Sequence, residues 1–253
     1  MAGRVEDKVA IVTGGASGIG RGAAEALARE GARVVITDVQ EELGRDAAKA
    51  IGGDAVFVRH DVTSEDSWRS AIAAALERFG RLDVLVNNAG IIIVVDIEET
   101  TVEQWRKIMA VNAEGVFLGC KHAIPAMRRS GGGSIINLSS AAGLVGTPMF
   151  PAYSASKGAV RLLTKSVAAH CRNKGDAIRC NSIHPGGIDT PLLRAITRTP
   201  SLPNLEENLA APGRALGMGT PADIGHLVVY LASDESRFMN GSEVAIDVCF
   251  TAV

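Results

Sequence analysis

Short apolar, β-branched runs alternate along the chain with longer segments of helical periodicity, and this alternation constrains the fold most. Seven runs fit buried strands: Val9–Val12, Arg33–Thr37, Ala55–Arg59, Val84–Asn87, Ser134–Leu138, Arg179–Ile183 and Val244–Ile246. Six segments fit helices: Gly18–Glu30, Glu41–Ile51, Ser64–Phe79, Val102–Arg129, Ala152–Arg172 and Pro221–Ala232. Near-continuous apolar strands between helices predict a parallel sheet covered on both faces. With right-handed crossovers, residues 1–253 form one doubly wound, Rossmann-type α/β domain with about seven strands.

Charge and composition exclude several classes of partner. The 26 basic and 28 acidic residues nearly cancel and form no Lys/Arg block, so neither a nucleic-acid surface nor an anionic-membrane surface is expected. No apolar run approaches the roughly 18 residues of a membrane span, and an apolar strand so near the N-terminus leaves no room for a signal peptide. The four cysteines show no metal-ligand spacing. These features predict a reduced, cytoplasmic protein without a metal site.

A glycine-rich turn follows the first predicted strand and opens the first predicted helix. It reads Thr13-Gly14-Gly15-Ala16-Ser17-Gly18-Ile19-Gly20. Glycines let the backbone turn tightly and approach a pyrophosphate, whose charge is stabilised by the helix N-terminus. The glycines fit G-x-x-x-G-x-G from Gly14 and also G-x-G-x-x-A from Gly18, so the register of the motif stays open. Either register favours a phosphate site over a ligand-free turn.

Asp38 stands at the end of the second strand, where an acidic residue would select the nucleotide. It follows Gly20 by 18 residues. A carboxylate there would hold the adenine ribose hydroxyls of NAD and repel the 2′-phosphate of NADP. Neither Ala16, Ser17 nor Val39 offers a cation for that phosphate. The predicted cofactor is therefore NAD.

Tyr153 and Lys157 are spaced four residues apart within the helix predicted for Ala152–Arg172. Residues i and i+4 lie on one helix face, and an ammonium beside a phenol favours the phenolate. A phenol of lowered pKa can pass a proton to or from a substrate oxygen near neutral pH. Such pairs also occur by chance on helix surfaces, so the spacing gains its meaning from the motifs around it.

Taken together, the motifs resemble those of the short-chain dehydrogenase/reductase family over nearly the whole chain. Their order and spacing match: Thr13-Gly14…Gly18-Ile19-Gly20, Asp61-Val62, Asn87-Asn88-Ala89-Gly90, Asn112, Ser140, Tyr153…Lys157 and Pro185-Gly186…Thr190. Three further stretches are similar to bacterial 3β/17β-hydroxysteroid dehydrogenases and alicyclic alcohol dehydrogenases: residues 57–62, 177–185 and 231–236. These stretches indicate kinship and not a substrate.

The resemblance implies four catalytic residues: Asn112, Ser140, Tyr153 and Lys157. Tyr153 would be the acid/base, and Ser140 would hydrogen-bond the substrate oxygen. Lys157 would lower the pKa of Tyr153 and bind the nicotinamide ribose. Asn112 would anchor a proton-relay water, although a purely local hydrogen bond is the alternative. Ser140 is preferred to Ser139 because the family serine lies thirteen residues before its tyrosine.

The resemblance also implies a cofactor cleft and an assembly. The expected cofactor-binding residues are Gly14, Ser17, Gly18, Ile19, Gly20, Asp38, Asp61, Val62, Asn88, Ala89, Gly90, Tyr153, Lys157, Pro185, Gly186, Ile188 and Thr190. Asp61 and Val62 would lie near the adenine, and Ile188 and Thr190 would hold the carboxamide. A homotetramer is implied through the two long helices that follow strands four and five. His184 receives no role from the sequence.

The segment from about Thr190 to Thr220 lacks strong periodicity and is rich in proline. Long segments of this kind inside a compact domain are often functional, so it is predicted to be a substrate lid. Apolar residues flank the expected reacting carbon: Leu144, Val145, Met149, Phe150, Leu192, Leu193, Ile196 and Leu202. They predict a hydrophobic, cyclic or steroidal secondary alcohol or its ketone as substrate, or else they merely pack the lid against the core. Arg194 and Arg198 could face solvent or a carboxylate.

Two other functions remain open on the same fold. A 3-ketoacyl reductase would usually prefer NADPH, and the missing cation beside Asp38 disfavours it. A non-catalytic, dinucleotide-sensing protein could lose the tyrosine or the lysine, yet this chain retains all four catalytic positions. The predicted function is therefore an NAD-dependent dehydrogenase of secondary alcohols.

Overall fold

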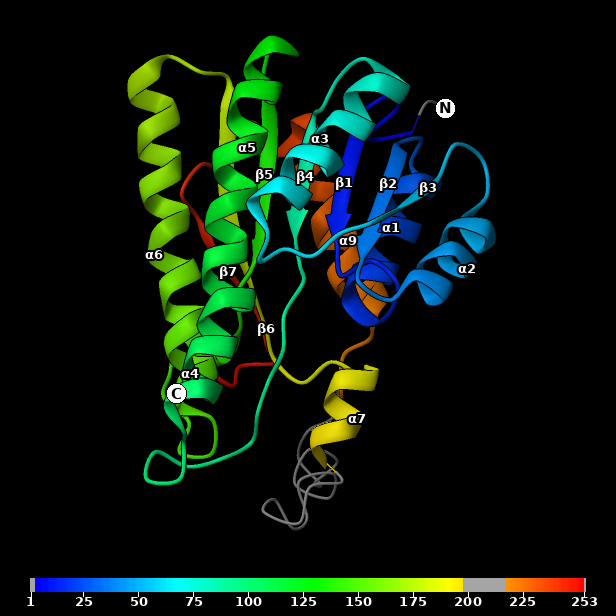
Figure 1. The fold of residues 1–253 in the computed structure, drawn as a ribbon. Coiled ribbons are helices and arrows are strands. Elements are labelled where there is room, and N and C mark those ends of the chain that lie inside the picture. Colours follow the sequence, from blue (N-terminus) through cyan, green and yellow to red (C-terminus); the bar gives the residue numbers. More distant parts are fainter. Residues whose placement is uncertain (1–2, 198–216, 253) are drawn as a thin grey trace.

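A parallel sheet between two layers of helices organises the chain in the computed structural model, which describes residues 3–197 and 217–252 (Figure 1). The strand order is β3-β2-β1-β4-β5-β6-β7, and every neighbouring pair is parallel. The strands are β1 (Val9–Thr13), β2 (Arg33–Asp38), β3 (Val56–Arg59), β4 (Val84–Asn87), β5 (Gly133–Leu138), β6 (Ile178–Pro185) and β7 (Glu243–Ile246). The predicted seven-stranded doubly wound fold is confirmed, and the predicted strands lie within two residues of the observed bounds.

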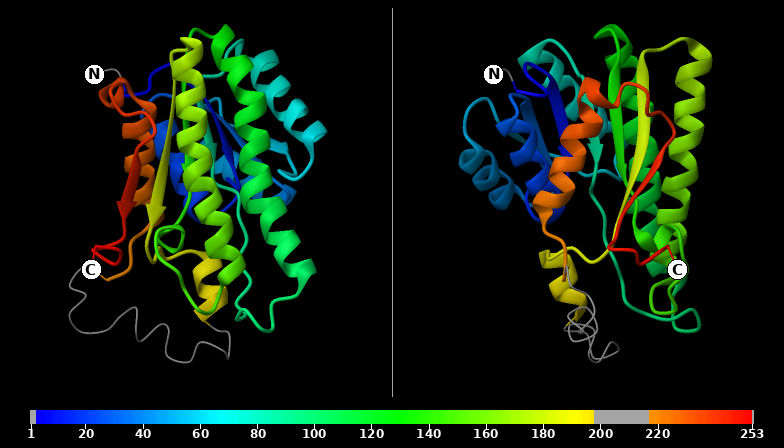
Figure 2. Two further views of the ribbon diagram at one scale, coloured as in Figure 1. Left: turned by 90° about the vertical axis from the view of Figure 1, so that its left-hand side faces the viewer. Right: turned by 180° about the vertical axis from the view of Figure 1, so that it is seen from behind.

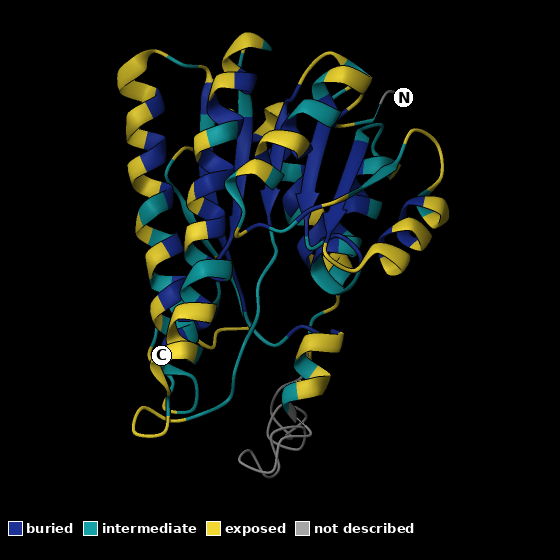
Figure 3. Cartoon of the chain, in the orientation of Figure 1, coloured by how far each residue is buried: buried dark blue, intermediate teal, exposed yellow. Residues whose placement is uncertain are grey.

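Helices cover both faces of the sheet, as Figure 2 shows from the side and from behind. One layer holds α1 (Gly18–Arg29), α2 (Glu41–Ile51) and α9 (Pro221–Ala232); the other holds α3 (Glu65–Phe79), α4 (Val102–Met109), α5 (Gly115–Arg129) and α6 (Pro151–Lys174). Each layer encloses a hydrophobic cluster, one around Leu27 and Val228 and one around Trp68 and Met127. Figure 3 shows buried strands beneath helices whose outer faces are exposed. Burial on both faces explains the near-continuous apolar strands.

One long helix was expected over Val102–Arg129, and the structure divides it. A π-helical turn, η1 (Ala110–Glu114), separates α4 from α5 and contains Asn112. A single π-turn keeps the chain helical from α4 into α5, so a continuous run of helix-forming residues does not reveal it. The helices themselves begin as their sequences predict; Thr101, for example, forms a capping box with Gln104 at the start of α4.

The predicted lid, about residues 190–220, is described only at its two ends. Its first part forms a short helix, α7 (Pro191–Thr197), beyond the carboxyl edge of the sheet, as Figure 1 shows. Residues 198–216, which include Leu202 and Arg198 of the predicted pocket, lie outside the described residues. Within the two described ranges, no helix has the length and apolar character needed to cross a membrane.

Candidate active site

A cavity of about 750 Å³ lies at the carboxyl ends of the strands. Ligands of open α/β sheets bind in this place, because the loops after parallel strands converge there. Every residue expected to bind the cofactor lines this cavity except Gly20. Of the four expected catalytic residues, Ser140, Tyr153 and Lys157 line it, whereas Asn112 does not. One cavity therefore joins the glycine-rich turn to the tyrosine and lysine of α6.

The glycine-rich turn is packed so tightly that side chains would not fit. Gly14 has φ +63°, and a Cβ there would come within 2.9 Å of the Ala89 Cα atom. At Gly20 a Cβ would lie 2.2 Å from the Gly14 carbonyl oxygen and 2.4 Å from the Asn88 amide. Gly20 itself does not line the cavity; it permits the close approach of α1 to the turn, and its role in cofactor binding stays a prediction.

Asn88 holds the glycine-rich turn against the end of β4. Its side-chain amide donates to the carbonyls of Thr13 at 2.9 Å and Gly14 at 3.2 Å. The hydroxyl oxygen of Thr13 accepts hydrogen bonds from the backbone N–H groups of Asn88 and Ala89 at 2.9 and 3.0 Å. Two adjacent loops of the cavity are thus fixed to each other.

The beginning of α1 suits a nucleotide pyrophosphate. Ser17 is the N-cap residue, but its side chain makes no capping hydrogen bond, and the first turn of α1 contains no acidic residue. The first N–H groups of a helix need a partner and carry partial positive charge, which favours an anion. Together with the glycine cradle, this arrangement fits the dinucleotide that the sequence predicts.

Asp38 is held rigidly at the wall of the cavity. Its two carboxylate oxygens accept hydrogen bonds from the backbone N–H groups of Ala16 at 3.2 Å and Gln40 at 3.0 Å. The residue is only 8% exposed, while the neighbouring Val39 is 54% exposed and also lines the cavity. Among the described residues of the lining, Lys157 is the only lysine or arginine.

Asp61 and Val62 follow β3 on the same side of the cavity. The Asp61 carboxylate accepts hydrogen bonds from the backbone N–H and the hydroxyl of Thr63, which hold its pKa below the usual value. The Val62 carbonyl accepts the indole N–H of the buried Trp68 at 2.9 Å. This loop is therefore ordered by its own hydrogen bonds, independently of a nucleotide.

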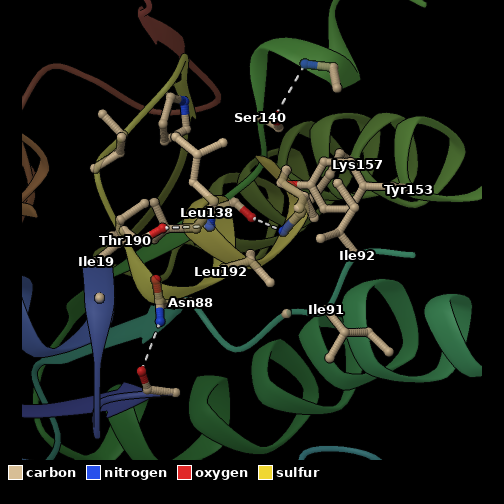
Figure 4. A pocket seen from close by; sticks show the side chains of 18 of the residues that line it. Ile19, Asn88, Ile91, Ile92, Leu138, Ser140, Tyr153, Lys157, Thr190 and Leu192 are labelled. Atoms are coloured by element: carbon tan, nitrogen blue, oxygen red, sulfur yellow. Dashed lines mark hydrogen bonds between the residues drawn. The ribbon is translucent and has the colours of Figure 1, made fainter. Parts of the chain in front are cut away.

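Tyr153 and Lys157 lie together on α6, as the i, i+4 spacing predicts (Figure 4). The ammonium nitrogen of Lys157 is 5.7 Å from the centre of the Tyr153 ring and donates to the Leu138 carbonyl at 2.8 Å. The Tyr153 phenol hydrogen-bonds the hydroxyl of Ser140. Ser139, by contrast, donates its hydroxyl to the Lys157 carbonyl at 2.8 Å. Only Ser140 therefore presents its hydroxyl to the phenol.

The pKa values of this pair differ from the sequence-based expectation. Burial raises the pKa of the Tyr153 phenol, and the hydrogen bond with Ser140 only partly opposes this. Burial also lowers the pKa of Lys157 to about 8. At Tyr153 burial therefore outweighs the hydrogen bond with Ser140, and a lowering of its pKa by Lys157 stays a prediction.

Asn112 lies behind the cavity wall, fully buried in the π-turn. Its side-chain oxygen accepts the Ile91 N–H at 2.8 Å, and its amide donates to the Ile91 carbonyl at 2.9 Å and the Ser156 hydroxyl at 3.1 Å. A Cβ on Gly90 would lie 3.3 Å from the Asn112 side-chain oxygen and 3.5 Å from the Lys157 ammonium. The four expected catalytic residues are thus neighbours in space, with Asn112 fixing the loop after β4.

Lys157→Met should stabilise the protein without nucleotide at pH 7 while abolishing turnover. The shift of the Lys157 pKa from 10.5 to about 8 corresponds to about 3 kcal/mol against the folded state below pH 8, before the lost hydrogen bond to Leu138 is counted. Between pH 8 and 10.5 the wild type gains stability, because its unfolded chain holds a proton that the folded chain has released. The advantage of the variant should therefore shrink in that window.

Urea unfolding at pH 7 and at pH 10 measures both effects. Lys174→Met is the control, since Lys174 is exposed near the end of the same helix. A Lys157→Met variant that is less stable than the wild type at pH 7, or whose advantage does not change with pH, would contradict this prediction.

The cavity has further walls that the sequence analysis missed. Val248 and Phe250 line it from the turn after β7, where Val248 and Cys249 have positive φ values of 53° and 70°. The Asp247 carboxylate fixes this turn by accepting hydrogen bonds from the N–H and hydroxyl of Thr251. The predicted topology could have indicated Val248 and Phe250, because both follow the carboxyl end of the last parallel strand, where ligands of such sheets bind.

The predicted apolar pocket residues divide into two groups. Met149, Phe150, Leu192, Leu193 and Ile196 line the cavity, whereas Leu144 and Val145 do not. Arg194, for which a solvent or carboxylate role was left open, makes a bidentate ion pair with Asp189 at 2.7 and 2.8 Å.

Comparisons with known proteins agree with this architecture. A family model described as Enoyl-(Acyl carrier protein) reductase matches residues 14–251. The NADP-dependent (R)-specific alcohol dehydrogenase of Lentilactobacillus kefiri is 45% identical, and the alignment covers 100% of both chains. The 3-beta-hydroxysteroid dehydrogenase of Comamonas testosteroni is 44% identical, and the alignment covers 98% of this chain and 97% of that protein.

A solved structure extends the agreement to the fold. The crystal structure of levodione reductase matches with a TM-score of 0.92 and 31% identity, and the match covers 98% of this chain and 99% of that one. The recognition made from the sequence motifs is thus confirmed: the chain belongs to the short-chain dehydrogenase/reductase family of oxidoreductases.

Proposed function

We propose that the chain is an NAD(H)-dependent oxidoreductase that interconverts a hydrophobic, cyclic or steroidal secondary alcohol and its ketone. The observation that carries this proposal is a single cavity lined by Asp38, by the glycine-rich turn and by the cluster of Ser140, Tyr153 and Lys157. Such a cavity can hold a nucleotide and a carbonyl compound side by side. Fold alone would not fix the function, but these side chains have the chemistry that the reaction needs.

Tyr153 is the proposed proton donor and acceptor. Burial raises the pKa of its phenol, so the phenol is protonated at neutral pH, the form that donates to a ketone oxygen. The Ser140 hydroxyl, which already contacts the phenol, would hydrogen-bond the same substrate oxygen. When bound, the nicotinamide nucleotide would supply or accept the hydride. Lys157 would place its positive charge beside the phenol and the nicotinamide ribose.

Asn112 is the proposed anchor for the return of the proton from solvent. Both protons of its side-chain amide are already donated, to Ile91 and to Ser156. The Ser156 hydroxyl in turn donates to the Tyr153 carbonyl at 2.7 Å. The side chain therefore holds the Ile91 loop and the start of α6 in place, and a relay water anchored at Asn112 would have to donate to one of its oxygens, since both amide protons are used.

The choice of NAD rests on Asp38. The relative from L. kefiri is named as NADP-dependent, so kinship alone does not select the nucleotide. A carboxylate fixed by two backbone N–H groups suits the ribose hydroxyls and repels a 2′-phosphate, since it cannot rotate away. The absence of arginine from the described lining supports the same choice.

The apolar part of the cavity supports a hydrophobic substrate. Besides Ser140 and Tyr153, this part is lined by aliphatic and aromatic residues from the loop after β4, η1, the segment before α6, α7 and the turn after β7: Ile91, Ile92, Val111, Met149, Phe150, Leu192, Leu193, Ile196, Val248 and Phe250. Such walls bind rings by burying apolar surface and discriminate each added methylene by only about 1–3 kcal/mol. The 3-beta-hydroxysteroid dehydrogenase among the relatives is named for a substrate of this class.

Steady-state kinetics on three substrates should separate the possible pockets. Cyclohexanol and a 3β-hydroxysteroid should both be oxidised, and a short 3-ketoacyl thioester should be reduced at least about tenfold less efficiently, a difference of about 1.4 kcal/mol. The thioester offers the apolar walls little area to bury and brings polar groups that they do not bind. Efficient turnover of the thioester alone would identify a ketoacyl reductase instead.

The homotetramer stays a prediction. Four large apolar side chains are exposed on the two segments to which the assembly was assigned: Val102 (56%) and Trp105 (40%) of α4, Phe117 (48%) of α5 and Leu162 (64%) of α6. Exposed apolar surface of this kind is typical of interfaces between subunits.

A further inference from the structure

His184 lies in β6, one residue before Pro185, and is completely buried. It does not line the cavity, yet its imidazole lies directly behind the residue expected to hold the substrate oxygen. Nδ1 is 3.1 Å from the Ser140 carbonyl oxygen, and Nε2 is 2.9 Å from the Ser182 hydroxyl. No role for this histidine follows from the sequence, because its contact with Ser140 depends on how β5 and β6 pair.

The two contacts fix the tautomer. A carbonyl oxygen can only accept, so Nδ1 carries the proton and donates it to Ser140. Nε2 then has a free lone pair, which accepts the Ser182 hydroxyl. Burial lowers the pKa of His184, which keeps the ring neutral at neutral pH. The charged groups that face it are Glu243 of β7 and Arg161 and Lys157 of α6.

This hydrogen bond links the turn that carries Ser140 to the sheet. The Ser139 N–H donates to the Ile183 carbonyl at 2.8 Å, which ends the backbone pairing between β5 and β6. One residue further on, the Ser140 carbonyl accepts both His184 Nδ1 and the Gly143 N–H, the latter at 2.9 Å from within its own turn. Through its side chain, His184 therefore adds a hydrogen bond from β6 to the Ser140 carbonyl, one residue beyond the last backbone hydrogen bond between the two strands.

We propose that His184 is a positioning residue, which aims the Ser140 hydroxyl by holding its peptide carbonyl. The proposal rests on the proposed function, in which that hydroxyl hydrogen-bonds the substrate oxygen beside Tyr153. A displacement of about 1 Å in such a group can cost about 10²-fold in rate. Loss of the His184 contact should therefore lower kcat without weakening nucleotide binding, since its hydrogen-bond partners, Ser140 and Ser182, are not among the residues expected to bind the cofactor.

Two amide replacements separate the two ring nitrogens. In His184→Asn the side-chain amide can take the place of Nδ1 and still donate to Ser140, whereas in His184→Gln it reaches only the place of Nε2, toward Ser182. We expect kcat to fall about 10-fold or more in His184→Gln and to be largely rescued in His184→Asn. The dissociation constant for NADH should match the wild type in both variants. Equal loss in the two variants, or a change only in nucleotide affinity, would overturn the proposal.

A double-mutant cycle with Ser140→Ala tests whether His184 acts through Ser140. If it does, His184→Gln should change kcat little once the Ser140 hydroxyl is gone. Fully additive losses would mean a general structural effect and would overturn the proposal. The two claims remain distinguishable, because a Ser140→Ala variant with full turnover contradicts the proposed function. Loss in Ser140→Ala without loss in His184→Gln contradicts only the role of His184.

The tautomer of His184 can be tested in the wild-type protein, so this test does not depend on whether a variant in β6 folds. Nitrogen-15 NMR of the wild-type histidines should show a buried imidazole protonated at Nδ1 and free at Nε2 at pH 7. An Nε2-protonated His184 could not donate to the Ser140 carbonyl, and that result would overturn the proposal.

Discussion

Tyr153→Phe should lower turnover of the alcohol or ketone by about 10²–10⁴-fold, the usual contribution of a general acid or base. The ring of Tyr153 packs edge-on against Phe150 with 6.0 Å between the ring centres, and phenylalanine preserves that packing. What the variant loses is the proton and the hydrogen bond with Ser140. Steady-state kinetics should show the fall in kcat, and titration with NADH should show that the nucleotide affinity is nearly unchanged.

The chain provides its own control for this variant. Tyr230 is the only other tyrosine in the sequence, and it lies in α9, away from the cavity lining. Tyr230→Phe should leave kcat unchanged. A Tyr153→Phe enzyme that keeps more than a few per cent of wild-type turnover would remove Tyr153 from the role of acid/base.

The sequence predicted the fold well because its local and long-range signals agree. Adjacent parallel strands β1 (Val9–Thr13) and β4 (Val84–Asn87) are buried throughout and apolar up to their last residue, and a helix signal follows each of them. Glycine spacing located the first turn, since only glycine fits 2.2 Å from the Gly14 carbonyl. Each of these features lies within a short stretch of consecutive residues, so it can be recognised in one sequence without knowledge of the fold.

The details of the site were less predictable where they depend on contacts between distant residues. The hydrogen bond between His184 and Ser140 spans 44 positions, and the π-turn at Asn112 leaves the helical pattern intact. The raised pKa of Tyr153 also arises from burial by other parts of the chain, which i, i+4 spacing does not report. Motif order therefore predicted most of the residues that gather at the cavity, and the structure was needed to show what each one contacts.

Asp38 should decide between the two nucleotides. We expect the wild type to prefer NAD over NADP by at least about 100-fold in kcat/KM, a difference of about 2.7 kcal/mol. Its carboxylate is 8% exposed and held by the N–H groups of Ala16 and Gln40, so a 2′-phosphate would meet a fixed negative charge. Asp38→Ala combined with Val39→Arg should weaken or reverse the preference, because Val39 already lines the cavity and is 54% exposed.

Asp38→Asn separates the effect of the negative charge at this position from the effect of its hydrogen bonds. The amide retains an oxygen that can accept one of the two backbone N–H groups, but it no longer repels a phosphate. NADP should therefore gain in this variant, and NAD should lose part of its affinity because the neutral oxygen binds the ribose hydroxyls less strongly. Kinetics with both nucleotides at one ionic strength compare the three proteins, since salt screens the repulsion. If the wild type used NADP as efficiently as NAD, or if Asp38→Asn left the ratio unchanged, the carboxylate at the end of β2 would not be the selecting group.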